Sequence, residues 1–247
     1  FFAHYPSWSD EQRKAYAARH YIPYWLNVET EQQIEHERLM AEAKAKGEMV
    51  ATEVKTDRFT AITALTVYAP DHPRFLAIIT GACAAASANI AGAQIFTTAD
   101  GMALDTILIQ RHFEDEEDER RRAERVATLV RQALRGEIWL KDMIGKVQHP
   151  ESRLQAFTVA PRVIIDNDSS NRYTVIEVNG RDRIGLLYDL TEALYGLSLN
   201  IGSAHIATFG ERAVDVFYVT DLTGSKIVNP NRHAQIERRL TAALEAK

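Results

Sequence analysis

A loop with the sequence NGRDRIG, residues 179–185, carries groups that could bind a free amino acid. Gly180 and Gly185 allow the backbone to approach a small molecule closely. A helix is expected directly after this loop, and the unpaired N–H groups at its start could bind a carboxylate. Asp182 could bind an α-ammonium group, and Asn200, at the start of the next expected strand, offers both a donor and an acceptor. Together these groups predict an amino-acid site.

A second copy of this pattern lies 111 residues earlier in the chain. The agreement continues from the loop to the following strand, and after a one-residue difference at a turn it resumes in the strand after that. It predicts an internal duplication and therefore two related modules. The aligned pairs are Asp71 with Asp182, Asn89 with Asn200, Ile90 with Ile201, Gln94 with His205 and Asp105 with Asp215.

Each of these residues also has a purely structural explanation. Asp is a favoured helix N-cap, so the two loop aspartates could simply cap the helices that follow them. The two asparagines could simply shape the turn from helix to strand. A lone histidine such as His205 on a strand is more often structural than a ligand. Asp105 and Asp215 lie within apolar strands and could face solvent or mark a contact between sheets.

The composition excludes several classes of function. A chain of 247 residues, 46% hydrophobic, can bury the core of one large or two small domains. A net charge of −5 argues against binding to a nucleic-acid backbone. A single cysteine, Cys83, allows no internal disulfide and favours a reducing, cytoplasmic setting. No run of about 18 apolar residues predicts a membrane span.

No catalytic motif is present in the sequence. It has no HExxH, no phosphate-binding GxxxxGK[ST], no GxGxxG and no nucleophile elbow, and its histidines form no His-Asp dipeptide. We therefore expect no catalytic residue and no metal site in these residues. The chain begins with Phe1 rather than Met, so we expect it to be a piece of a longer protein whose catalytic part lies outside it.

Runs of β-branched residues, apolar residues at helical spacing and an Asp-Gly turn predict the strands and helices that position the loop around Asp71. We expect a first module over residues 59–167. Its elements in chain order are a strand over 60–69, a helix over 74–87, strands over 89–98 and 102–112, a helix over 116–135 and a strand over 157–166.

The later loop is expected in a second module over residues 172–247, whose fourth strand is missing or truncated. The order β-α-β-β-α, with a closing β in the first module, is that of a ferredoxin-like α+β fold. The strand over 157–166 could instead pair with the second module. The predicted elements are strands over 173–180, 199–209 and 212–221 and helices over 184–196 and 229–246.

The residues outside the two modules read as helical. Residues 1–58 have too few apolar positions to fold alone, so we expect a helical connector docked on something else, with a helix ending near Gly47. The charged run over 114–125 places its acids before its arginines, as suits the helix dipole and i,i+4 pairing. We expect a solvated helix face there rather than an interaction patch.

Longer stretches carry a resemblance to a known family. The segment RDRIGLLYDLTEALYGLSLNI resembles an ACT domain, a small regulatory module that binds amino acids. DNDSSNRYTVIEVNGRDRIGLLYDLTEAL, APDHPRFL with ANIAGAQIFTTADGMALDTI, and RKAYAARHYIPYWL are similar to the C-terminal tandem ACT region of bifunctional PII uridylyltransferase/uridylyl-removing enzymes. The resemblance covers nearly the whole chain.

The resemblance implies a function for this part of such an enzyme. The full enzyme would add uridylyl groups to the PII signalling protein with a nucleotidyltransferase domain, using UTP and Mg or Mn. It would remove them by hydrolysis with a metal-dependent HD domain. Both domains would lie outside this chain. Glutamine, signalling nitrogen sufficiency through the ACT pair, would suppress addition and favour removal.

The resemblance also implies which residues hold glutamine. In the first copy Arg74 stands where the second copy has Gly185, and such a bulky cation could block the pocket or remodel it. We therefore favour the second site. The implied residues of the second copy are Asp182, Arg183, Ile184, Gly185, Leu186, Asn200 and Ile201, and those of the first are Asp71, His72, Arg74, Phe75, Asn89 and Ile90.

Two other functions remain open at this stage. The chain could be a structural dimerisation module that pairs with a second copy through its sheets. It could also be an RNA-binding module, because the RNA-recognition motif shares the same element order. That motif needs basic and aromatic residues on its third strand, which MALDTILIQ lacks, and Phe217 and Tyr218 are adjacent and so point to opposite faces.

Overall fold

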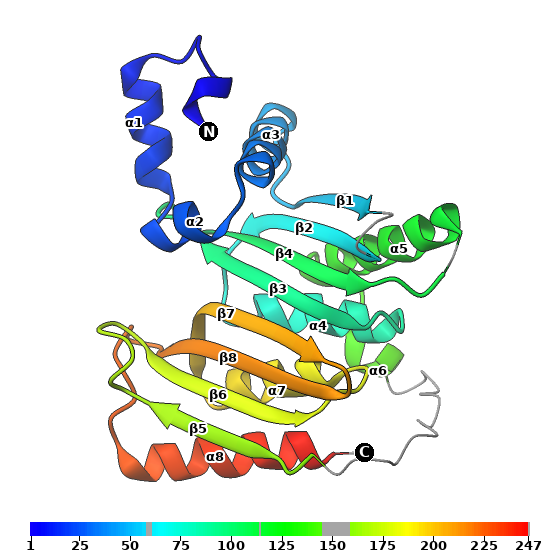
Figure 1. Ribbon diagram of the computed structural model, residues 1–247, viewed down its shortest axis with the longest axis vertical. Helices are drawn as coiled ribbons and strands as arrows, with labels where there is room; N and C mark the ends of the chain where they lie inside the picture. The colour runs from blue at the N-terminus through cyan, green and yellow to red at the C-terminus, as the bar shows by residue number, and fades with distance from the viewer. Residues whose placement is uncertain (58–60, 114, 145–158, 247) are drawn as a thin grey trace.

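The computed structural model describes residues 1–57, 61–113, 115–144 and 159–246. Within them one antiparallel sheet of eight strands runs in the order β1-β2-β4-β3-β7-β8-β6-β5 (Figure 1). The strands are β1 (Ala51–Asp57), β2 (Ile62–Pro70), β3 (Ile90–Thr97), β4 (Met102–Gln110), β5 (Arg162–Asp166), β6 (Thr174–Arg181), β7 (Leu199–Phe209) and β8 (Arg212–Asp221).

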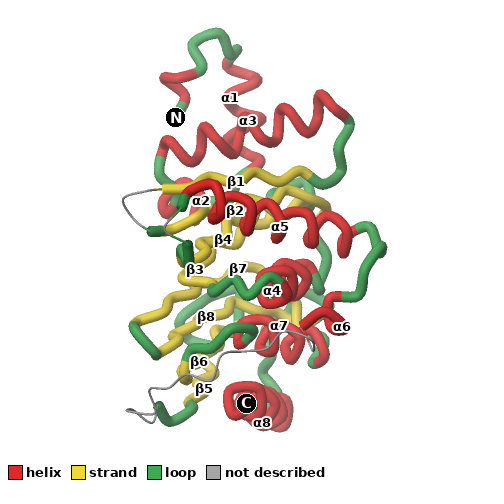
Figure 2. Tube along the Cα trace, turned by 90° about the vertical axis from the view of Figure 1, so that its right-hand side faces the viewer, coloured by secondary structure: helices red, strands yellow, loops and turns green. Residues whose placement is uncertain are grey.

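Helices cover one face of this sheet along its whole width, as Figure 2 shows. They are α4 (Phe75–Ala85), α5 (Glu116–Leu134), α6 (Leu140–Ile144), α7 (Leu186–Gly196) and α8 (Pro230–Glu245). A single apolar core lies between these helices and the sheet, and it includes Ile79 and Ile107 of the first half and Leu190 and Phe217 of the second. The two halves therefore fold around one shared core rather than as separate domains.

Each half has the same layout. Strands β1-β2-β4-β3 of the first unit (β1 to α5) repeat as β5-β6-β8-β7 in the second unit (β5 to α8). The predicted α+β class, with two ferredoxin-like units in tandem after a helical segment, is confirmed. The predicted positions of most strands and helices agree with the structure to within a few residues.

The edge strand of each unit corrects two of our expectations. Strand β5 pairs with β6, so the strand predicted over 157–166 belongs to the second unit and not to the first; residues 157 and 158 lie outside the described residues. The second unit therefore does not lack a fourth strand. The equivalent strand of the first unit is β1, which we had placed in the helical connector over 1–58. In both units the edge strand precedes the other elements.

Physical reasons explain why β1 was missed. Its sequence ATEVKTD contains Ala, Glu, Lys and Asp, which are depleted in strands. Those residues are acceptable at the edge of a sheet, where charged side chains also discourage pairing with other chains. A hairpin partner directly before β2 fills the same edge position as a strand returning after α5, so the sheet order of a ferredoxin-like fold is kept.

The N-terminal helices pack on the opposite face of the first unit. They are α1 (Asp10–Arg19), α2 (Ile22–Asn27) and α3 (Thr30–Lys46), after a short 3-10 helix over Phe2–His4. Tyr24 and Met40 pack there against Tyr68 and Leu104 of the sheet. Gly47 ends α3 in the left-handed conformation (φ 66°), as predicted. The segment is therefore helical and docked, up to β1.

The two units meet across a local two-fold axis. Strands β3 and β7 pair through Gly92 with Ala207, Ala93 with Ile206 and Gln94 with His205. Under the helices, the hydroxyls of Thr80 on α4 and Thr191 on α7 lie 3.0 Å apart, and these residues are 111 positions apart in the chain. The duplicated sequence thus folds into two units that face each other.

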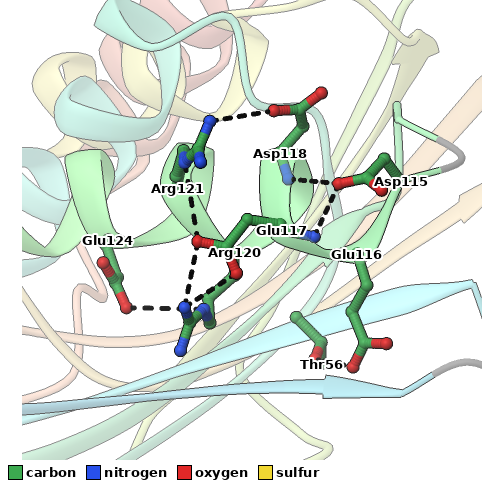
Figure 3. Close-up of polar contacts among 8 residues, drawn as sticks. All are labelled: Thr56, Asp115, Glu116, Glu117, Asp118, Arg120, Arg121 and Glu124. Atoms are coloured by element: carbon green, nitrogen blue, oxygen red, sulfur yellow. Dashed lines mark hydrogen bonds and ion pairs between the residues drawn. The ribbon is translucent and has the colours of Figure 1, made fainter.

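Most charged side chains over residues 115–125 form a solvated face on α5 (Figure 3). Asp115 caps the helix by accepting hydrogen bonds from the backbone N–H groups of Glu117 and Asp118, at 2.9 and 3.0 Å. Arg120 and Arg121 pair with the acids one turn before them. The expectation of a solvated, self-paired face is confirmed for these residues. Residue 114 lies outside the described part of the chain.

Two members of that run behave differently. Glu119 is fully buried and pairs with Arg122 at 2.5 Å. Its carboxylate also accepts hydrogen bonds from the backbone N–H groups of His112 and Phe113. These two residues therefore fix the start of α5 against the end of β4, which is a structural task.

Candidate functional site

The Asp182 loop lies between β6 and α7, at the boundary of the two units. Gly185 occupies the N-cap position of α7 with φ 84°, a conformation that favours glycine. The backbone N–H of Asp182 donates to the carbonyl of Glu211 at 2.8 Å, which ties the loop to the β7–β8 turn. The Asp182 side chain does not cap the helix. It accepts a 3.2 Å hydrogen bond from the Asn89 side chain of the first unit.

This contact corrects the pairing that we expected within the second copy. We had grouped Asp182 with Asn200 and Ile201 of its own unit. Strand β7 runs from Leu199 to Phe209, and the Asp182 loop lies beside its far end. Because β3 pairs antiparallel with β7, the start of β3 with Asn89 and Ile90 reaches that end instead. The Asp182 loop therefore meets the strand of the other unit, not that of its own.

A small cavity lies at this meeting point. Its volume is ≈ 20 Å³, which is room for about one water molecule. A free amino acid therefore enters only if the loop and the facing strand separate. Its walls are formed by Thr80, Ala84, Ala88, Asn89, Ile90, Asp182, Arg183, Gly185, Leu186, Leu187, Tyr188, Ile206, Thr208, Ala213 and Asp215.

Asp215 is a site residue that the sequence did not identify. It lies on the helix-covered face of β8 with 2% of its surface exposed, so it neither faces solvent nor lies between two sheets. Burial, reinforced by the charge of nearby Asp182, raises the pKa of Asp215 to about 7. Burial also raises the pKa of Asp182, against the opposing effect of the Asn89 hydrogen bond. Two carboxylates thus share one small cavity.

The remaining residues predicted around this loop have different roles. Arg183 donates to the Asp189 carboxylate and to the Ala243 carbonyl, so it fastens the loop to α7 and α8. Leu186 is buried in the core and also lines the cavity. Ile184 lies in the loop but is not part of the cavity wall.

The Asp71 loop is the equivalent loop of the first unit. Asp71 accepts a 3.1 Å hydrogen bond from the Thr97 hydroxyl, and its backbone N–H donates to the Gly101 carbonyl at 3.0 Å. Burial raises the pKa of Asp71. Asp105 repeats the position of Asp215: it is 1% exposed, and burial followed by the charge of Asp71 raises its pKa far above the usual range.

Bulky side chains fill the first copy where the second is open. Arg74 replaces Gly185 and forms an ion pair with Glu192 of α7 at 2.9 Å. Its guanidinium also lies over the Tyr195 ring, 5.6 Å from the centroid. Tyr195 is the equivalent of Ala84, whose Cβ lies 3.8 Å from where a Cβ on Gly185 would be. Small residues, Gly185 and Ala84, thus adjoin the Asp182 cavity where the first copy has Arg74 and Tyr195, and we call the Asp182 site the open copy and the Asp71 site the filled copy for this reason.

The last predicted residues of the first copy serve the packing of that loop. His72 accepts the backbone N–H of Arg74 at 3.3 Å and meets the Phe75 ring edge to face. Phe75 is buried in the core. Asn200 and Ile201 lie at the start of β7, at the end of the sheet that carries the Asp71 loop.

Other features of the described residues do not add a site of this kind. A wider hollow of ≈ 1170 Å³ lies between α1, α3 and the sheet edge, with walls that include Trp8, Tyr16, Met40 and Met102. Among the described residues no three His, Cys, Asp or Glu side chains are placed to hold a metal ion. No helix in the described part is long and apolar enough to span a membrane.

Comparison with known families agrees with this geometry. Residues 162–247 match the family described as "ACR9-like, ACT-like domain". An ACT-like domain is present there. ACT domains are regulatory modules that bind amino acids, often as dimers, and are not catalytic by themselves. The match begins at β5, so it includes the edge strand that the structure assigns to the second unit.

Among the solved structures that are similar is the aspartate kinase from Synechocystis, which is 16% identical with a TM-score of 0.38. The similarity covers 76% of this chain and 28% of the length of the kinase.

Proposed function

We propose that this chain is a regulatory module that senses glutamine at the boundary between its two units. The observation that carries the proposal is the hydrogen bond from Asn89 to Asp182, which brings together the two polar groups predicted to bind an amino acid. Asp182 would take the ammonium group, Asn89 would take a polar group of the ligand, and the start of α7 would take the carboxylate.

A ligand at this position would change how the units meet. The cavity of ≈ 20 Å³ is far below the size of an ordinary ligand pocket, so glutamine must displace the Asn89–Asp182 contact and part the loop from β3. The module would therefore have a closed and a liganded arrangement. Different ligand contacts in the two arrangements are what allosteric regulation requires.

The N-terminal helices are well placed to respond to such a change. Gln94 of β3 pairs with His205 at the local two-fold axis, and its side chain accepts a hydrogen bond from Gln32 of α3 at 3.1 Å. His36 of α3 bonds to Thr106 on the neighbouring strand β4. A shift of β3 against β7 would therefore be transmitted to α3 through these hydrogen bonds.

The wider role follows from the family resemblance. We propose that the chain is the C-terminal regulatory part of a bifunctional PII uridylyltransferase/uridylyl-removing enzyme. Glutamine bound here would suppress uridylylation of PII and favour its deuridylylation by catalytic domains outside the chain. The tandem units and the ACT-like match support a regulatory module; the choice of glutamine and PII rests on the resemblance.

The proposal predicts unequal effects at the two equivalent asparagines. Asn89→Ala removes a group of the open site and should weaken glutamine binding about tenfold or more, the usual effect of losing a hydrogen bond to a charged group. Asn200→Ala changes the same residue in the filled copy and should leave the affinity near that of the wild type. Calorimetric titration of both variants with glutamine measures this.

The same titrations can contradict the proposal. Equal losses in the two variants would place the ligand outside the Asp182 site, and no heat with wild-type protein would argue against glutamine. Circular dichroism spectra of both variants, compared with wild type, check that the fold is intact.

A dimerisation module without a ligand is the second candidate, and one observation favours it. Helices α2 and α3 cover the free sheet face of the first unit. The same face of the second unit carries Val214, Val216 and Tyr218, which are only half-buried. An RNA-binding role has no such support, because Phe217 is fully buried in the core and is not available for stacking on a base.

A further inference from the structure

The Asp215 carboxylate is a buried charge without a sufficient partner. One of its oxygens, Oδ1, is buried and has no hydrogen bond. The backbone N–H of Ala207 is a hydrogen-bond donor to the carboxyl group, and the neighbours in register on the adjoining strands, Val178 and Ile206, are apolar. Burying an unpaired acid costs free energy, and an apolar residue would suit the same position better for folding. Stability alone therefore does not explain Asp215.

The same arrangement occurs in the first unit. Asp105 is buried at the equivalent place on β4, both of its carboxylate oxygens lack a hydrogen-bond partner within normal distance, and the charge of Asp71 adds to burial in raising its pKa. A buried acid behind a loop acid is thus built into both copies. It is not an accident of packing in one of them.

The chemistry of the open cavity favours a cation. Asp182 and Asp215 both line it, and the other ionisable side chains there are Arg183 and Tyr188. The guanidinium of Arg183 is already held by Asp189 and by the Ala243 carbonyl. A compact ammonium group would supply the charge and the N–H donors that both carboxylates need.

We propose that Asp215, together with Asp182, binds the ammonium group of the ligand and restricts the site to free amino acids. This inference rests on the proposed function and adds the residue that selects the ligand. When the ammonium group binds, the proton on the Asp215 carboxyl leaves to solvent, and the resulting carboxylate pairs with the ligand. No covalent bond other than this O–H bond is broken, and the Asn89–Asp182 hydrogen bond gives way to the ligand.

Binding should therefore depend on pH. The pKa of Asp215 near 7 means that the free protein holds a proton there below neutral pH. The groups that face it are Asp182 and Arg183 from the loop and Tyr188 from α7; the facing residues of α4, β3 and β7 that line the cavity are uncharged. Affinity for an ammonium ligand should rise about tenfold per pH unit below 7 and level off above it.

The test is calorimetric titration of the whole 247-residue chain from pH 5.5 to 8.5, in buffers of different ionisation enthalpy. The probes are glutamine, the other common amino acids, and 4-carbamoylbutanoate, which is glutamine without its ammonium group. We expect proton release on glutamine binding near pH 6. We expect 4-carbamoylbutanoate to bind at least tenfold more weakly above pH 7.

Variants separate a ligand contact from a structural role. Asp215→Asn should bind glutamine at least tenfold more weakly above pH 7 and lose both the pH dependence and the proton release. Asp105→Asn makes the same change in the filled copy and should keep both. Thermal melting checks that each variant folds, and Asp215→Glu, which keeps the charge, should retain the pH dependence if the Asn variant does not fold.

Each outcome decides the inference. Equal binding of glutamine and 4-carbamoylbutanoate, or an unchanged pH profile in folded Asp215→Asn, would overturn it while leaving glutamine sensing intact. Binding of a different amino acid with the same Asp215 dependence would support it and overturn glutamine as the ligand. Failure of every amino acid to bind would overturn both.

Discussion

Asp215 shows how a single buried group links this site to protein stability. Its pKa in the folded protein is raised to about 7 from an ordinary value of 3.8, mainly by burial. The folded state therefore holds a proton that the unfolded state has lost between these two values. The contribution of this group to the free energy of unfolding is fully present below about pH 4 and is lost as the pH rises towards 7.

This shift predicts the effect of removing the titrating group. Asp215→Asn cannot ionise, so the variant should gain thermal stability relative to the wild type as the pH rises from about 4 to 7, by up to a few kcal/mol, and the difference should then level off. Melting curves of both proteins across this range measure it. A difference that stays constant with pH would show that Asp215 is not protonated in the folded protein.

Residue types and spacing were enough to mark Asp182 and Asn89 as candidates but not to show that they lie together. The duplication identified both as candidates, yet nothing in the local sequence shows that β3 would pair with β7. That pairing is a long-range contact, and it decides which asparagine faces which loop. The location of the Asp215 side chain was also left open, because the alternation of residues along a strand does not reveal which face of the strand is covered by helices.

At the scale of elements, local patterns predicted most helices and strands, since apolar periodicity directly reports burial. The exception is the edge strand β1. Edge strands have one free side and tolerate charged residues, so the composition of β1 resembles that of a loop or a helix. The edge strand β5 was predicted as a strand from its β-branched residues, and only its assignment to the first unit was wrong. The unit to which an edge strand belongs depends on which strand lies next to it, and that is a tertiary contact.

The filled first copy gives a prediction at this scale. Arg74→Gly combined with Tyr195→Ala reproduces the Gly185 and Ala84 pair of the open site and removes the Arg74–Glu192 ion pair. We expect the double variant to bind two glutamine molecules per chain and the wild type one. Calorimetric stoichiometry measures this.

The matched control is Arg120→Gly combined with Leu26→Ala, which removes an exposed arginine from α5 and an exposed apolar side chain from α2, two helices that carry neither loop. It should bind one glutamine. A double variant at Arg74 and Tyr195 that stays folded and still binds only one would mean that the filling side chains do not decide the difference between the two sites.

At the scale of the whole molecule, the two sheet faces are unequal. The helical face is closed by α4, α5, α7 and α8, and α2 and α3 close the opposite face only over the first unit (Figures 1 and 2). The free face of the second unit carries half-buried Val216 and Tyr218 beside Glu177 and His205.

This difference predicts concentration-dependent self-association through the second unit, as in ACT-domain pairs. Val216→Glu places a charge on the free face and should shift the chain towards the monomer by about tenfold or more in dissociation constant. The control is Thr128→Glu, which adds the same charge on the exposed side of α5. Val54→Glu on β1 would not serve, because the Val54 side chain packs towards the core. Light scattering over a concentration series measures both. Identical curves for Val216→Glu and wild type would exclude this face.

The central claim is that one ligand is held by both units at once. The most direct measurement is the change in backbone amide NMR shifts on titration with glutamine. The account predicts saturable changes concentrated in two segments far apart in sequence, residues 88–92 and 181–188, with much smaller changes at residues 71–76. Shifts confined to a single unit, or none at all, would contradict it.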